Sequence, residues 1–288
     1  MASSRFIFAG SLLYLVLRRR GLPNPTLSQW KSAAIVGTLL FMGGNGLVTW
    51  AEQEIPSGIA ALVIATMPMW MTLFDWLLFK GPKPGGKTIL GLALGLTGIV
   101  LLIGPGQFIS GETELNLAYM GGLMCAPIFW SIGSLYSRKA DLPSNVFMTN
   151  SIEMLCGGAV LAAVSIGFGE PFNFSFGNVT NEAWISLIYL TIFGSMIALT
   201  AYAWLLKNAP AAKVATYSYV NPIIAVFLGW LILNEKISVE TLIAVVVIVG
   251  GVIMVVTDKA VKNSQPTSDE TTNLRGGETV MEEDCPVD

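Results

Sequence analysis

Histidine is absent from this 288-residue chain, and charged residues make up only 12% of it. Without histidine the chain lacks the side chain that most often serves as a proton relay or metal ligand near neutral pH. The three cysteines, Cys125, Cys156 and Cys285, have no spacing typical of a disulfide framework or a zinc site. We therefore expect no metal and no cofactor. The net charge of −3, with no basic cluster, argues against nucleic acid as a partner.

Apolar residues, in contrast, make up 53% of the chain, and the mean hydropathy is +0.64. A soluble domain has about a quarter of its residues charged, so this chain has too little charge to cover a surface that faces water. A helix needs about 20 apolar residues to cross a bilayer. Nine segments approach or exceed this length: 3–17, 33–50, 56–79, 88–104, 115–136, 144–168, 183–206, 211–233 and 239–257. The sequence predicts an all-α polytopic membrane protein with nine transmembrane helices.

Lysine and arginine gather on one side of this predicted bundle. Fourteen of the 16 basic residues lie in alternate linkers or after the last span, whereas the opposite linkers carry mainly glutamate. Basic residues favour the cytoplasmic side, so we expect a protein of the cell inner membrane with a cytoplasmic C-terminus. The polar segment 259–288 is predicted to be a disordered cytoplasmic tail.

An internal repeat relates the two halves of the chain. Pro68 and Trp76 recur 154 positions later as Pro222 and Trp230. Five predicted crossings separate the two copies, so the copies point in opposite directions, as in the inverted repeats of secondary transporters. The units are 1–105, with four spans, and 115–258, with five. Since the unmatched span is 115–136, we expect the first helix of the first repeat to be missing from this chain.

Four segments carry a resemblance to a known family: RFIFAGSLL, GNGLVTWAEQEIPSGIAALVIATMP, WSIGSLYSRKADLP and YVNPIIAVFLGWLILNEKIS. Together they resemble the EamA-type family of the drug/metabolite transporter superfamily, and its YedA-like branch in particular. The resemblance covers nearly the whole chain except the tail. It implies ten helices in two inverted five-helix repeats, here four plus five, and the export of small metabolites.

Polar and aromatic residues inside the spans are the candidates for a binding cavity, since such groups avoid lipid and face the bundle interior. The candidates are Asn45, Trp130, Ser134, Tyr202, Tyr217 and Asn221. Pro68 and Pro222 lie in the middle of spans, where proline removes a backbone donor and kinks a helix. Because they recur in both halves, we interpret them as gating positions, with static packing as the alternative. The glycines of GLALGLTG, 91–98, predict a close helix contact.

Glu153 is the carboxylate placed deepest in a span. A charge at this depth is costly, so an intramembrane carboxylate suggests a function, and proton coupling is the one we consider. The alternative is a structural glutamate held by hydrogen bonds. The sequence shows no buried cation to pair with it.

These observations favour a carrier that exports a small organic metabolite, amino-acid-like or drug-like, by alternating access. The expected partners are this solute and the lipid bilayer, and a homodimer is compatible with the sequence. A membrane-embedded enzyme is disfavoured, because the spans hold no histidine and no clustered carboxylates. An inactive truncated paralogue, or a membrane partner that does not transport, remains the alternative.

Overall fold

A computed structural model describes residues 2–55, 57–103, 117–169, 179–221, 223–224 and 239–258. All regular elements in these ranges are helical, and each of the nine predicted spans contains helix in its described part. The elements, with π-helices written η, are α1 (Ala2–Arg19), α2 (Leu27–Gly37), η1 (Thr38–Gly46), α3 (Leu47–Ala51), α4 (Ser57–Ile64), α5 (Met67–Leu78), α6 (Gly86–Ile103), α8 (Leu117–Ser137), α9 (Val146–Gly167), α10 (Asn181–Tyr189), η4 (Leu190–Ala198), α11 (Leu199–Asn208), α12 (Ala211–Ala215) and α14 (Val239–Thr257).

The helices have the length and surface of a membrane protein. Within the described ranges, four are long and apolar enough to cross a bilayer: Leu27–Ala51, Leu117–Ser137, Val146–Gly167 and Ala183–Asn208. Large apolar side chains face outward, among them Val246 and Ile185, which are 71% and 68% exposed. Polar side chains such as Ser131, Asn150 and Ser195 are buried instead. This inverted distribution is typical of a bundle surrounded by lipid, and the prediction of an all-α polytopic membrane protein is confirmed.

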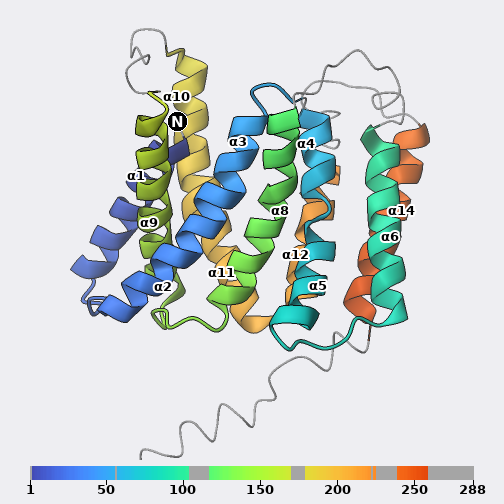
Figure 1. Cartoon of the computed structure of the whole chain (residues 1–288), viewed down its shortest axis with the longest axis horizontal. Helices are drawn as coiled ribbons and strands as arrows, with labels where there is room; N and C mark the ends of the chain where they lie inside the picture. Colours follow the sequence, from blue (N-terminus) through green and yellow to red (C-terminus); the bar gives the residue numbers. More distant parts are fainter. Residues whose placement is uncertain are drawn as a thin grey trace, which may run out of the picture.

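The helices stand side by side in one bundle (Figure 1). The pair α1 and α9 packs at one edge, and the pair α6 and α14 packs at the opposite edge. Between these pairs, α8 packs against η1, α3, α4 and α5. The two edge pairs each join one helix from the first half of the chain to one from the second.

Contacts within the pair α1 and α9 are reciprocal. A Cβ atom added at Gly10 would lie 3.0 Å from Cγ of Leu155, and one added at Gly158 would lie 3.0 Å from Cγ1 of Ile7. Gly10 and Gly158 are 148 positions apart, as are Ile7 and Leu155. The same contact, a glycine against a branched apolar side chain, therefore occurs twice across the interface, as expected when equivalent helices of an inverted repeat pack against each other.

Helices α6 and α14 approach each other as closely as α1 and α9 do. A Cβ atom added at Gly91 would lie 2.7 Å from the carbonyl oxygen of Gly251, and one at Gly251 would lie 2.6 Å from that of Gly91. The predicted close contact of the glycine-rich segment 91–98 is confirmed. At one end of this pair, Asp258 accepts hydrogen bonds from the backbone N–H and the hydroxyl of Thr88, at 2.9 and 2.7 Å.

The predicted span 56–79 is not one kinked helix. Helix α4 ends at Ile64, Ala65 and Thr66 form a turn, and α5 begins at Met67. Pro68 therefore lies in the first turn of α5, where a missing N–H breaks no helical hydrogen bond. The expectation of a mid-helix kink at Pro68 is wrong, because the helix stops before the proline and starts again at it.

Candidate functional site

Four of the six predicted cavity residues lie in one cluster of aromatic rings and hydroxyls. The indole Nε1 of Trp130 donates a hydrogen bond to the hydroxyl of Tyr202 at 2.9 Å, and this hydroxyl also bonds to Oγ of Ser134 at 2.8 Å. The Tyr202 ring centroid lies 5.7 Å from that of Trp130 and 5.4 Å from that of Tyr217. We refer to Trp130, Ser134, Tyr202 and Tyr217 as the aromatic cluster.

Helical spacing and a close glycine contact position this cluster. Trp130 and Ser134 are four residues apart on α8, so their side chains lie on one face and reach the same hydroxyl. The ring of Trp130 packs directly over η1. A Cβ atom added at Gly44 would lie 2.6 Å from Cε3 of Trp130, so any larger residue at position 44 would push the indole away.

The first half of the chain also contributes to the cluster. The hydroxyl of Tyr217 donates to Sδ of Met67, the first residue of α5, at 3.8 Å. A second helix break precedes Tyr217, because α12 ends at Ala215 and Thr216 forms a turn. At each break a threonine hydroxyl donates to the carbonyl oxygen three residues earlier. Thr66 donates to Val63 at 2.6 Å, and Thr216 donates to Lys213 at 2.7 Å. The cluster thus lies where two interrupted helices meet α8 and α11.

The two predicted asparagines form no hydrogen bond with this cluster in the described part of the chain. Asn45 lies in η1, and its amide donates to the carbonyl of Leu40 at 3.5 Å. Asn221 is exposed. Pro222, the second predicted gating residue, lies outside the described residues. The structure thus brings four of the six predicted residues together, and their role in binding stays a prediction.

Glu153 lies beside the aromatic cluster, in the interior. Its side chain is 3% exposed, and its Oε1 has no hydrogen-bond partner among the described residues. It lines a cavity of about 20 Å³ together with Asn150, Tyr202 and Lys207. A polar cavity needs about 10–15 Å³ to hold one water molecule, so this one is large enough for a single water. Tyr202 belongs to both the aromatic cluster and this cavity.

Lys207 is a neighbour of Glu153 that sequence reasoning missed. No cation was expected near the carboxylate, because Lys207 falls just after the predicted span 183–206. In the structure it lies in the last turn of α11, and its side chain reaches back to the Glu153 cavity. Its ammonium group also donates to the carbonyl of Pro143 at 3.2 Å. The length of the lysine side chain, which hydropathy does not register, lets a residue beyond the predicted span line this cavity.

Two π-helices are the other feature that sequence reasoning missed. Segment η1 covers Thr38–Gly46, and η4 covers Leu190–Ala198. Shifted by the repeat interval of 154 residues, η1 would cover 192–200, so both halves have the same irregularity at nearly the same place. The amide of Asn150 on α9 donates to the carbonyl of Ser195 in η4 at 3.3 Å and to the hydroxyl of Thr200 in α11 at 2.8 Å. π-Helices are rare and occur frequently at functional sites.

The apolar helical bundle and its buried aromatic cluster are those of a membrane protein, and comparisons with known proteins identify its family. The family model described as the EamA-like transporter family matches residues 1–104 and 117–257. The chain belongs to this family.

Named transporters are similar to this chain over most of its length. The uncharacterized inner membrane transporter YedA of Escherichia coli K12 is 37% identical over 267 residues, covering 92% of this chain and 84% of YedA. The uncharacterized transporter YoaV of Bacillus subtilis is 24% identical, covering 86% of this chain and 83% of YoaV. A crystal structure at 21% identity matches the fold with a TM-score of 0.69 and covers 88% of this chain and 86% of its own. The chain is therefore a membrane transporter, and the resemblance to the YedA-like branch expected from its sequence is confirmed.

Proposed function

We propose that this transporter exports a small organic metabolite, amino-acid-like or drug-like, by alternating access, and that the aromatic cluster binds the solute. The observation that supports this most directly is the convergence of Trp130, Tyr202 and Tyr217, with Met67 from the other half of the chain. Aromatic rings with a few directed hydroxyls are typical of small-molecule sites.

The helix breaks support a moving part at this site. A helix interrupted at Ala65–Thr66 can change the angle between α4 and α5 without breaking their internal hydrogen bonds. The break at Thr216 offers the same freedom next to Tyr217. We propose that α5, which starts at Met67–Pro68, tilts as the site changes sides, and that Pro222 has the corresponding role.

Glu153 is proposed as the proton-coupling residue. A buried carboxylate with an unpartnered oxygen, beside a water-sized cavity and a lysine, is suited to binding and releasing a proton. Tyr202 lines the same cavity and bonds to Trp130, so protonation and solute occupancy can influence each other through one side chain. We place the protein in the cell inner membrane, with its C-terminus in the cytoplasm.

Proteoliposomes test the proposed activity. They would be incubated with a defined mixture of labelled amino acids and aromatic amines under an imposed pH gradient, and their contents measured by mass spectrometry. The wild-type protein should concentrate at least one component. Tyr217→Ala should abolish its accumulation while leaving the amount of folded protein unchanged. No accumulation of any component by wild-type protein would favour the inactive or non-transporting alternative.

A second experiment, which uses the solute that accumulates, tests the proton-coupling role of Glu153. Glu153→Gln should lose accumulation driven by the pH gradient yet keep solute exchange between equal concentrations, because exchange needs no net proton movement. Glu52→Gln removes a carboxylate just after α3, at the edge of the bundle, and should behave as wild type. If Glu153→Gln still concentrates the solute, Glu153 is a structural residue.

A further inference from the structure

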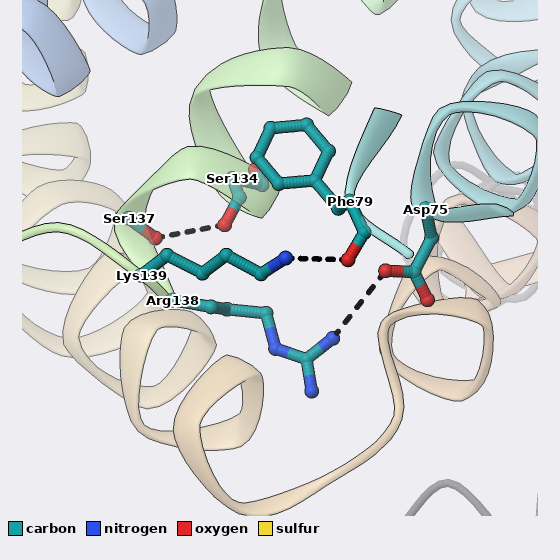
Figure 2. Close-up of polar contacts among 6 residues, drawn as sticks. All are labelled: Asp75, Phe79, Ser134, Ser137, Arg138 and Lys139. Atoms are coloured by element: carbon teal, nitrogen blue, oxygen red, sulfur yellow. Dashed lines mark hydrogen bonds and ion pairs between the residues drawn. The ribbon is translucent and has the colours of Figure 1, made fainter. Parts of the chain in front are cut away.

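A second pocket lies at the ends of α5 and α8, on the side of the bundle rich in basic residues. It has a volume of about 450 Å³. Its described lining residues are Asp75, Phe79, Lys80, Gly81, Pro82, Leu135, Arg138 and Lys139. Figure 2 shows Asp75 from α5 and Phe79 just after it, facing Arg138 and Lys139 from the turn that follows α8. We refer to this site as the basic pocket.

Positive charge exceeds negative charge in the basic pocket. Nη1 of Arg138 lies 4.0 Å from Oδ1 of Asp75 (Figure 2), and the guanidinium makes no other ion pair or hydrogen bond with a residue that the structure describes. The ammonium group of Lys139 donates to the carbonyl of Phe79 and lies 5.3 Å from the centroid of the Phe79 ring. Lys80 makes no ion pair or hydrogen bond with any described residue. Three cations therefore surround one carboxylate.

The backbone at Lys80 points to a role for its side chain. Helix α5 ends at Leu78, and the N–H of Gly81 closes the end by bonding to the carbonyl of Asp75 at 2.7 Å. This closure requires a left-handed residue, and Lys80 has φ +59°. Glycine normally occupies such a position, because other residues are strained there. Strained residues are retained at functional sites, so a lysine here suggests that its charge is needed.

The outer face of α5 beside the basic pocket is apolar. Trp76, Leu77 and Leu78, the last three residues of the helix, are 39%, 57% and 61% exposed. Tryptophan at a helix end is typical of the boundary between the hydrocarbon core and the headgroups. A ligand that places a negative charge in the pocket can therefore lay an apolar tail along the adjoining surface.

We propose that the basic pocket binds the phosphate group of an anionic phospholipid, with its acyl chains along the outer face of α5. Guanidinium and ammonium groups are the donors that bind phosphate oxygens most strongly. Basic pockets between transmembrane helices on the cytoplasmic side are suited to such headgroups. The occupied pocket would join α5 of the first half to α8 of the second, beside the Asp75–Arg138 contact.

Native mass spectrometry of the purified full chain tests this proposal, with phosphatidylglycerol and phosphatidylcholine of the same acyl chains as probes. Wild-type protein should retain phosphatidylglycerol preferentially. Each basic residue near a membrane surface contributes about a fivefold gain in affinity for anionic lipid, so Arg138→Gln should lose about this factor. Asp75→Asn removes the competing carboxylate and should raise retention. Lys83→Gln changes the charge of the same linker outside the pocket lining and should have little effect.

Lys80→Gly separates lipid binding from folding. Glycine relieves the left-handed strain, so this variant should fold at least as well as wild type and still bind about fivefold less phosphatidylglycerol. Equal retention of the two lipids by wild-type protein would overturn the proposal, as would unchanged binding by Lys80→Gly and Arg138→Gln. Displacement of phosphatidylglycerol by inorganic phosphate, but not by chloride at equal ionic strength, would assign the pocket to a soluble phosphate instead.

Discussion

Replacing Tyr202 by phenylalanine isolates the hydroxyl at the centre of the aromatic cluster. The ring contacts with Trp130 and Tyr217 remain, but the bonds of 2.9 Å to Trp130 and 2.8 Å to Ser134 are lost. Side-chain hydrogen bonds between membrane helices contribute about 0.6 kcal/mol on average and up to about 1.7 kcal/mol. Two bonds lost at a buried site should therefore lower the free energy of unfolding by about 1–3 kcal/mol.

Steric trapping in bicelles would measure this loss under conditions that keep the protein folded. Tyr189→Phe is the matched control, since Tyr189 lies in the membrane-length segment Ala183–Asn208 with Tyr202, is 58% exposed and bonds to no described residue through its hydroxyl. The double variant with Ser134→Ala should be less destabilised than the sum of the single variants, because both remove the same bond. A Tyr202→Phe effect no larger than that of Tyr189→Phe would refute the view that this hydroxyl organises the site.

Two glycine substitutions test the close helix contacts. Gly44→Ala should displace the indole of Trp130, since the new methyl group would lie 2.6 Å from the ring, and should reduce accumulation in proteoliposomes more than it reduces folded protein. Gly251→Ala should force α14 away from Gly91 and lower the free energy of unfolding by about 1–3 kcal/mol, measured by steric trapping. Gly250→Ala, with no atom within 4 Å of the added carbon, should have little effect, and equal losses at 250 and 251 would contradict this account.

Hydropathy and residue spacing predicted where the helices lie and which side chains share a face, because both depend on which residues avoid lipid. Each of the nine apolar ranges contains helix in its described part, because a backbone polar group in a bilayer needs a partner within its own helix. The four-residue spacing of Trp130 and Ser134 predicts a shared helix face, and both side chains reach Tyr202. The glycines of 91–98 predicted the close approach to α14 through the same reasoning about small residues.

Features that depend on hydrogen-bond register were not predictable in this way. A π-helix has nearly the same composition and hydropathy as an α-helix, so nothing in Thr38–Gly46 or Leu190–Ala198 marks the change of register. Pro68 indicated an irregularity, but not that the helix would end at Ile64 and begin again at Met67. The approach of Lys207 to Glu153 depends on the side chain's direction, which the end of a hydrophobic run leaves open.

The reciprocal packing of α1 on α9 and of α6 on α14 has a consequence for the origin and integrity of the fold. In each pair, a glycine-lined surface from one half of the chain is covered by a helix from the other half. The helices of each pair meet as those of two subunits of an antiparallel homodimer would, so a gene fusion that joined two such subunits would preserve both interfaces. An excised half would expose these surfaces unless it paired with a second copy of itself.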